Sequence, residues 1–130
     1  MKALIITDGT ESIESIALFI KESLKGYNTK ICCAKDFCGT DILPADIFFI
    51  GCESPSPDSF EYLEELLSHI NFASRKCGIF SIKNKTVKYL QGILKDCEAV
   101  VNAPLFVNID ETKEINEKDI KNWVKELIHE

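Results

Sequence analysis

The sequence predicts an α/β domain, built in three layers around a doubly wound, five-stranded parallel sheet. Three observations predict it. Short runs rich in Ile, Val and Phe lack strict polar alternation, which is typical of strands buried on both faces. Segments with helical spacing of apolar residues separate these runs, so strands and helices alternate. The 130 residues are close to the commonest size of one domain, so we expect a single domain over residues 1–130.

Five apolar runs are the expected strands. They cover residues 3–7, 29–34, 46–51, 77–82 and 99–107. Right-handed crossovers leave few topologies for five parallel strands.

Four amphipathic segments are the expected helices. Their apolar faces carry, in chain order, Ile13, Ile16, Ala17, Ile20 and Leu24; Phe60, Leu63, Leu67 and Ile70; Val87, Leu90, Ile93, Leu94 and Cys97; and Ile120, Trp123, Val124, Leu127 and Ile128. Gly26 offers a left-handed stop for the first helix. Ser56 is the expected N-cap of the second helix, and Pro57 lies in its first turn. Asn116 is expected to open the last helix, and residues 35–45 are a loop or one short helical turn.

The charge balance excludes one class of partner. The net charge is -6, the isoelectric point is near 5.0, and Arg75 is the only arginine. Nucleic-acid binders need clustered Lys and Arg to displace counterions from phosphates. No apolar run is long enough to cross a bilayer, and the start turns polar too early for a signal peptide. We therefore expect a cytoplasmic protein that binds neither nucleic acid nor membrane, with an acidic surface suited to basic partners.

The cysteines predict neither disulfides nor a metal site. Six are present, but no CxxC pair occurs and there are only two histidines. A domain of this size needs no covalent staples. Three of the cysteines lie in or beside apolar runs and are expected in the core: Cys32, Cys52 and Cys77.

The loops that follow the first, third and fourth strands are the expected functional positions. In doubly wound sheets, ligands bind beyond the carboxyl ends of the strands. The first of these loops contains Thr7, Asp8, Gly9, Thr10, Glu11 and Ser12. Hydroxyls and backbone amides at a helix N-terminus can hold a phosphate without basic side chains. The alternative is that Thr10 or Ser12 only caps the helix.

This loop resembles the first loop of the short-chain flavodoxins, which follows Ser/Thr-x-Thr-Gly-x-Thr and wraps the phosphate of FMN. The similarity extends over the whole chain, with five strands at the right spacing, a Gly51-Cys52 step after the third strand and a closing amphipathic helix. It implies a flavodoxin-like fold with strand order 2-1-3-4-5. It also implies noncovalent FMN binding and electron transfer between redox proteins with basic docking surfaces.

Two departures from the family pattern concern charge and position. The glycine falls third in the loop instead of fourth, and Asp8 and Glu11 are acidic where the family is usually neutral. A carboxylate about 6 Å from a phosphate charge costs roughly 2–3 kcal/mol at an effective dielectric constant near 20. We therefore expect FMN to bind only if both carboxylates turn to solvent while the amides of residues 9–12 converge. A carboxylate inside the hollow makes anion binding there implausible.

The resemblance implies that the other two loops frame the flavin ring. Their residues are Cys52, Glu53, Ser54, Pro55 and Ser56 after the third strand, and Ser81, Ile82, Lys83 and Asn84 after the fourth. The family places aromatic residues in both loops. In this chain the first aromatic residue after the third strand is Phe60, which the helical pattern assigns to the core. The alternative is that these loops bind nothing. The loop after the third strand is then only a sharp helix start, and the loop after the fourth strand is a solvated turn with Thr86 starting the next helix.

Other chemistries of this fold lack their motifs. No phosphoacceptor Asp ends the third strand, and no Cys-x5-Arg, GxGxxG or Walker A sequence occurs. Two functions stay open. The leading one is an FMN-dependent electron carrier, and the runner-up is a flavodoxin-like scaffold that has lost FMN and acts as a binding or interaction module. An enzyme that uses bound FMN is a third possibility, but no general acid or base stands out.

Overall fold

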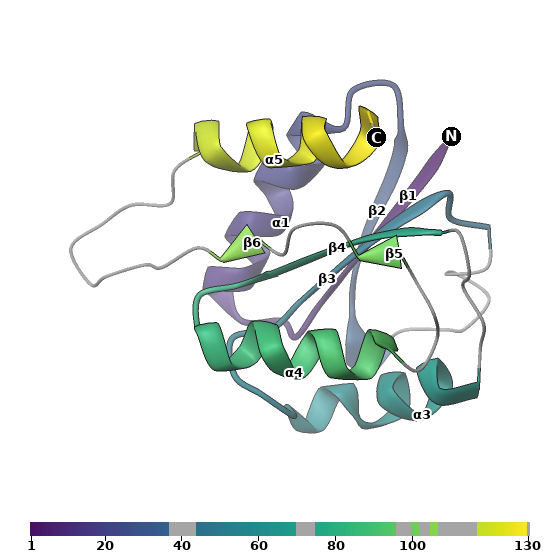
Figure 1. The fold of residues 1–130 in the computed structure, drawn as a ribbon, viewed down its shortest axis with the longest axis vertical. Helices are drawn as coiled ribbons and strands as arrows, with labels where there is room; N and C mark the ends of the chain where they lie inside the picture. Colours follow the sequence, from purple (N-terminus) through teal and green to yellow (C-terminus); the bar gives the residue numbers. More distant parts are fainter. Residues whose placement is uncertain (37–43, 70–74, 96–99, 102–104, 107–116, 130) are drawn as a thin grey trace.

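The computed structural model describes residues 1–36, 44–69, 75–95, 100–101, 105–106 and 117–129. The strands are β1 (Lys2–Thr7), β2 (Asn28–Cys33), β3 (Ile47–Gly51), β4 (Lys76–Ser81), β5 (Val100–Val101) and β6 (Leu105–Phe106). The helices are α1 (Glu11–Ser23), α3 (Glu61–His69), α4 (Asn84–Lys95) and α5 (Glu117–His129), with 3-10 turns η1 (Ala34–Asp36) and η2 (Asp58–Phe60). Figure 1 shows α1 and α5 over one face of the sheet and α3 and α4 over the other.

The sheet is parallel and has the order β2-β1-β3-β4-β5, with β6 also paired to β4. The predicted fold class and strand order are confirmed. Within the described residues, the fifth strand consists of two short pieces, β5 and β6, that pair with the two ends of β4.

Alternating side chains of the buried strands divide the interior into two cores. Leu4, Ile6 and Phe48 pack under α3 and α4, whereas Ile5 and Phe49 pack under α1 and α5. Phe49 meets Trp123 of α5 edge to face, with ring centroids 5.6 Å apart. The continuous apolar runs of the sequence follow from this burial on both faces.

The helix faces match the predicted ones wherever side chains are described, and Gly26 has the predicted left-handed conformation (φ 88°). Two helix starts differ from prediction. Ser56 does not cap the second helix, because the chain first forms η2, whose N-cap is Pro57, and α3 begins only at Glu61. The next helix begins at Asn84, two residues before Thr86. Ile70, Cys97 and Asn116 lie outside the described residues.

The cysteines of the described part are free thiols. Cys52 and Cys77 are fully buried, as predicted, and Cys32 is partly buried against the same core. In that part of the chain, no group of three or more His, Cys, Asp or Glu side chains could hold a metal ion. Of the helices that are described, none is long and apolar enough to span a membrane.

Candidate functional site

Three loops gather at the carboxyl ends of the central strands, at the left of Figure 1. Loop 1 (residues 7–12) joins β1 to α1, loop 2 (52–57) follows β3, and loop 3 (81–84) joins β4 to α4. Because the strands are parallel neighbours, the three loops meet at one edge of the sheet, as the sequence predicts.

The carboxylate of Asp8 is partly buried and turns into loop 1. Its Oδ1 accepts hydrogen bonds from the Thr10 amide at 3.1 Å and the Thr10 hydroxyl at 2.7 Å. Its Oδ2 accepts from the Glu53 amide of loop 2 at 2.8 Å. Gly9 turns the chain at φ 82°, a conformation that few other residues adopt without strain. The Thr10 hydroxyl, one of the donors that the sequence resemblance assigns to a phosphate, thus already has a carboxylate partner.

The remaining hydroxyls of loop 1 also donate to the chain's own carboxylates. Thr7 Oγ1 donates to Glu14 Oε1 at 2.6 Å, and Ser12 Oγ donates to Glu53 Oε2 at 3.3 Å. Thr10 is the N-cap residue of α1, but its side chain makes no capping hydrogen bond because its hydroxyl serves Asp8. The side chain of Glu11 is exposed, as FMN binding would require. Glu11 therefore points outward, whereas Asp8 points into the loops.

Loops 2 and 3 are joined directly by hydrogen bonds. Ser81 Oγ donates to the Cys52 carbonyl at 2.7 Å, and Thr86 Oγ1 donates to the Glu53 carbonyl at 3.0 Å. Lys83 Nζ lies 3.3 Å from the Ser54 hydroxyl. The two segments that were expected to frame a flavin ring thus contact each other, and the role of Thr86 is to hold loop 2.

The remaining predicted site residues contribute little polar chemistry. Ile82 packs against the core beneath α1 and α5, Asn84 is exposed at the first turn of α4, and Pro55 is half-buried. Ser56 adopts a left-handed conformation (φ 48°). No aromatic side chain belongs to loops 1, 2 or 3, and Phe60 is fully buried in the core as predicted.

The thiol of Cys52 lies beneath these loops and is not a nucleophile. Burial raises the pKa of Cys52 above the usual value near 9, and the negative charges of Asp8 and Glu64 raise it further. The thiol is therefore protonated at neutral pH, whereas reactive cysteines need a lowered pKa. Tyr89 of α4 donates a hydrogen bond to Glu64 Oε1 of α3. The pKa of Tyr89 is also raised, mainly by burial and secondly by that hydrogen bond.

These contacts decide how well the residues fit FMN. The expected phosphate donors are present, but each hydroxyl of loop 1 already serves a carboxylate. A phosphate placed among them would face the charges of Asp8, Glu14 and Glu53. Loops 2 and 3 offer no ring to stack on a flavin. In this conformation the residues do not fit FMN, and the condition that the sequence sets for anion binding is not met.

A groove beside the loops carries acidic groups and one exposed aromatic ring. It measures about 330 Å³ and is lined by Lys35, Asp58, Ser59, Glu61, Tyr62 and Glu65. The groove lies where η1, η2 and the first turns of α3 meet. Tyr62 is 50% exposed.

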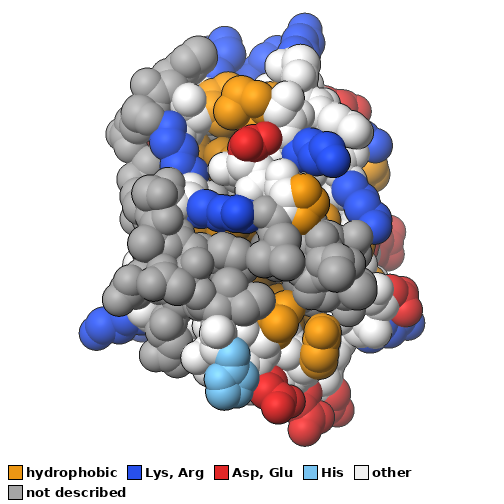
Figure 2. All heavy atoms as spheres, turned by 90° about the vertical axis from the view of Figure 1, so that its right-hand side faces the viewer, with side chains coloured by type: hydrophobic (Ala, Val, Ile, Leu, Met, Phe, Trp, Pro, Cys, Tyr) orange, Lys and Arg blue, Asp and Glu red, His pale blue; other side chains and the backbone are white. Residues whose placement is uncertain are grey.

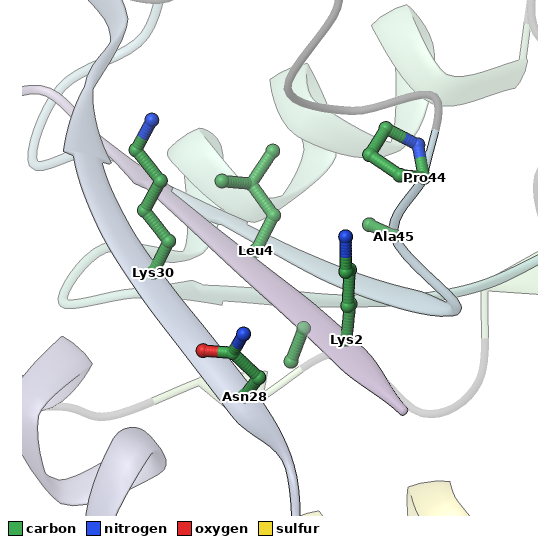
Figure 3. Close-up of a pocket in the computed structure, with 7 residues that line it drawn as sticks. Lys2, Leu4, Asn28, Lys30, Pro44 and Ala45 are labelled. Carbon is green, nitrogen blue, oxygen red and sulfur yellow. The ribbon is translucent and has the colours of Figure 1, made fainter.

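A second hollow lies at the opposite end of the sheet. It measures about 230 Å³ and is lined by Lys2, Ala3, Leu4, Asn28, Lys30, Pro44 and Ala45. Figure 3 shows Lys2 and Lys30 extending along its sides, with Leu4 between them. Sequence patterns do not predict this pocket, because its residues come from strand starts that only folding brings together.

No family model and no curated protein sequence matches the chain. Solved structures do match it over nearly its whole length. Oxidised flavodoxin 2 from Bacillus cereus has a TM-score of 0.84 at 19% identity, with 99% of each chain covered. A flavodoxin of Streptococcus pneumoniae TIGR4 has a TM-score of 0.79 at 16% identity, covering 98% of this chain and 97% of that one. The Fusobacterium nucleatum flavodoxin bound to flavin mononucleotide has a TM-score of 0.74 at 15% identity, covering 98% and 96%.

These comparisons agree with the topology. The chain is a doubly wound α/β protein with a parallel sheet. More specifically, it has the flavodoxin-like fold, as the sequence resemblance implied.

Proposed function

We propose that this flavodoxin-like chain is a binding module, which docks a protein partner with a Lys- and Arg-rich surface at the carboxyl end of its sheet. The acidic groove carries this proposal. Asp58, Glu61 and Glu65 are exposed around the Tyr62 ring and face one cation, Lys35. The net charge of -6 adds long-range attraction for a basic partner.

The chemistry of the groove favours arginine or lysine side chains over other ligands. Carboxylates pair with guanidinium groups in bidentate geometry, and an exposed tyrosine ring can carry a stacked guanidinium. Exposed charges of this kind at the edge of an interface raise the association rate and the specificity more than the affinity. The docking we propose is therefore weak, fast and sensitive to salt.

A second candidate is an FMN-dependent electron carrier that uses the same acidic surface. The observation that favours it is the fold likeness, since one of the similar structures is a flavodoxin bound to flavin mononucleotide. Bound FMN would supply the redox chemistry. Thr7, Thr10 and Ser12 would have to release their carboxylates to hold its phosphate, and loops 2 and 3 would have to separate for its ring. We rank this function second because the local contacts oppose both steps.

A peptide titration tests the proposed docking. The probe is a twelve-residue peptide of Lys, Arg and Gly, added at low salt to ¹⁵N-labelled protein. We expect saturable shifts of the amides of residues 58–65 that disappear in 0.5 M salt, because salt screens exposed charges. Replacing Glu61 and Glu65 by Gln should weaken binding by about two- to fivefold for each charge.

The matched control is Glu22→Gln, which removes one exposed charge from the distant last turns of α1. If that variant weakens the peptide as much as Glu61→Gln does, the attraction is only a property of the net charge and the groove is not a docking site. Shifts spread over the whole surface would contradict the proposal in the same way.

A further inference from the structure

The Asp8 carboxylate joins two loops that are 45 residues apart in the sequence. It accepts from Thr10 of loop 1 and from the amide of Glu53 in loop 2. Three donors, two amides and one hydroxyl, thus point to one negatively charged group. Donor sets of this kind at a helix N-terminus are the usual way in which proteins hold a bound anion.

We infer that Asp8 is a built-in anion, which fills the phosphate hollow of the fold, ties loop 1 to loop 2 and excludes phosphate-bearing ligands. This inference goes beyond the proposed docking and does not depend on the acidic groove that carries it.

Two neighbouring pairs reinforce the exclusion. Glu14 accepts from Thr7, and Glu53 accepts from Ser12, so the hydroxyls that flank Asp8 also have carboxylate partners. An incoming phosphate would have to displace Asp8 from its three donors while two further negative charges lie beside it. A hydrogen bond to a charged group is among the stronger ones in proteins, so each displaced contact adds to the cost.

The position of Asp8 also follows from local chemistry. Aspartate accepts readily from the amide two residues ahead in the chain, and Thr10 is at that distance. Gly9 lies between them in the left-handed conformation that lets the chain reverse. The Sγ of Cys33, at the end of β2, lies 3.2 Å from the place where a Cβ on Gly9 would be. The loop is therefore packed in the shape that directs the carboxylate inward.

The test compares Asp8→Asn with Glu11→Gln in the same loop. Both changes remove one negative charge, but the side chain of Glu11 is exposed, so the second variant controls for net charge. Inorganic phosphate and FMN are titrated into ¹⁵N-labelled protein, and the amides of Thr10, Ser12 and Glu53 are followed. Riboflavin, which lacks the phosphate, is the control ligand.

We expect no saturable response to phosphate or FMN in the unaltered chain. In Asp8→Asn, the affinity for both should rise by roughly thirty- to a hundredfold, which is the effect of one carboxylate at about 6 Å. Riboflavin should respond equally in all variants. The inference is overturned if the unaltered chain binds phosphate as tightly as Asp8→Asn, or if Glu11→Gln gains as much.

A readout without ligand keeps the inference testable if neither variant binds phosphate. Hydrogen exchange at the Glu53 amide should accelerate by about tenfold or more in Asp8→Asn, because that amide loses a charged acceptor. Glu11→Gln should leave the rate unchanged, and a circular-dichroism spectrum checks that both variants fold. Unchanged exchange in Asp8→Asn would show that the carboxylate does not tie the loops. A failure of peptide docking would leave these results untouched.

Discussion

The two ends of the central sheet differ in the charged side chains that line them. At the carboxyl end, Asp8, Glu14 and Glu53 accept hydrogen bonds from their own loops, so the negative groups are satisfied inside the chain. At the amino end, Lys2 and Lys30 line a pocket, and Figure 2 shows Lys and Arg side chains spread over that face. At this end the Lys2 amide donates to the Asp46 carboxylate at 2.7 Å.

A ligand position that is typical of a fold can be occupied by the chain's own side chains. The carboxyl end is where doubly wound proteins bind ligands, and here it is closed by side chains that donate to and accept from one another. The opposite end carries a hollow of about 230 Å³ that is lined by strand starts. The fold therefore does not by itself determine what the site can bind.

The largest effect that we expect concerns the link between loops 2 and 3. Ser81→Ala removes the buried hydroxyl that donates to the Cys52 carbonyl, which leaves that acceptor without this partner. Such a loss costs about 1–3 kcal/mol. Chemical denaturation of both proteins measures the change. A free energy of unfolding that falls by less than about 0.5 kcal/mol would show that the closed carboxyl end does not depend on this contact.

An effect of similar size is expected in alkali. Burial raises the pKa of Cys52 above its usual value near 9. The folded state then binds a proton that the unfolded state loses, so stability is full below pH 9 and falls as the pH rises above it. The expected slope is about 1.4 kcal/mol per pH unit for one proton. Tyr89 adds to this fall above its usual value near 10.

Urea denaturation at pH 8, 9 and 10 measures this decline. Cys52→Ala should reduce the slope between pH 9 and 10. Equal slopes in the two proteins would show that the Cys52 thiol is not kept protonated by the fold.

The smallest effect is expected at the amino end. Lys2→Gln replaces an exposed side chain beside the pocket and should change the free energy of unfolding by no more than about 0.5 kcal/mol. It should also leave the binding of the basic peptide unweakened, because the pocket and the acidic groove lie at different ends of the sheet. Weaker peptide binding in this variant would contradict the separation of the two ends.

Most of the fold was predictable because strands that are buried on both faces of a parallel sheet appear in the sequence as continuous apolar runs. The runs around Ile5 and Phe49 and the helical spacing of Ile13, Ile16 and Ile20 all reflect packing into the two cores. Helix starts were less predictable. Ser56 and Pro57 resemble a helix opening, but the chain forms a 3-10 turn there before α3.

The position of the candidate site was predictable from the sequence, but the hydrogen-bond partners of its side chains were not. The sequence marked Asp8 and Glu11 as the residues that decide anion binding. The bond between Asp8 and Thr10 has a readable spacing, whereas the Glu53 amide comes from another loop. The partners of Ser12, Ser81 and Thr86 are likewise distant in sequence, so only the folded chain brings them together.

The central claim is that the chain's own carboxylate fills the place of a cofactor phosphate. Its most direct test is a titration of the purified protein with FMN, followed by flavin fluorescence and the visible spectrum. We predict no saturation at hundreds of micromolar FMN for a protein that circular dichroism shows to be folded, an order-of-magnitude threshold on the affinity scale. Saturable quenching at micromolar protein, abolished by Thr10→Glu, would contradict the claim and establish an FMN site in loop 1.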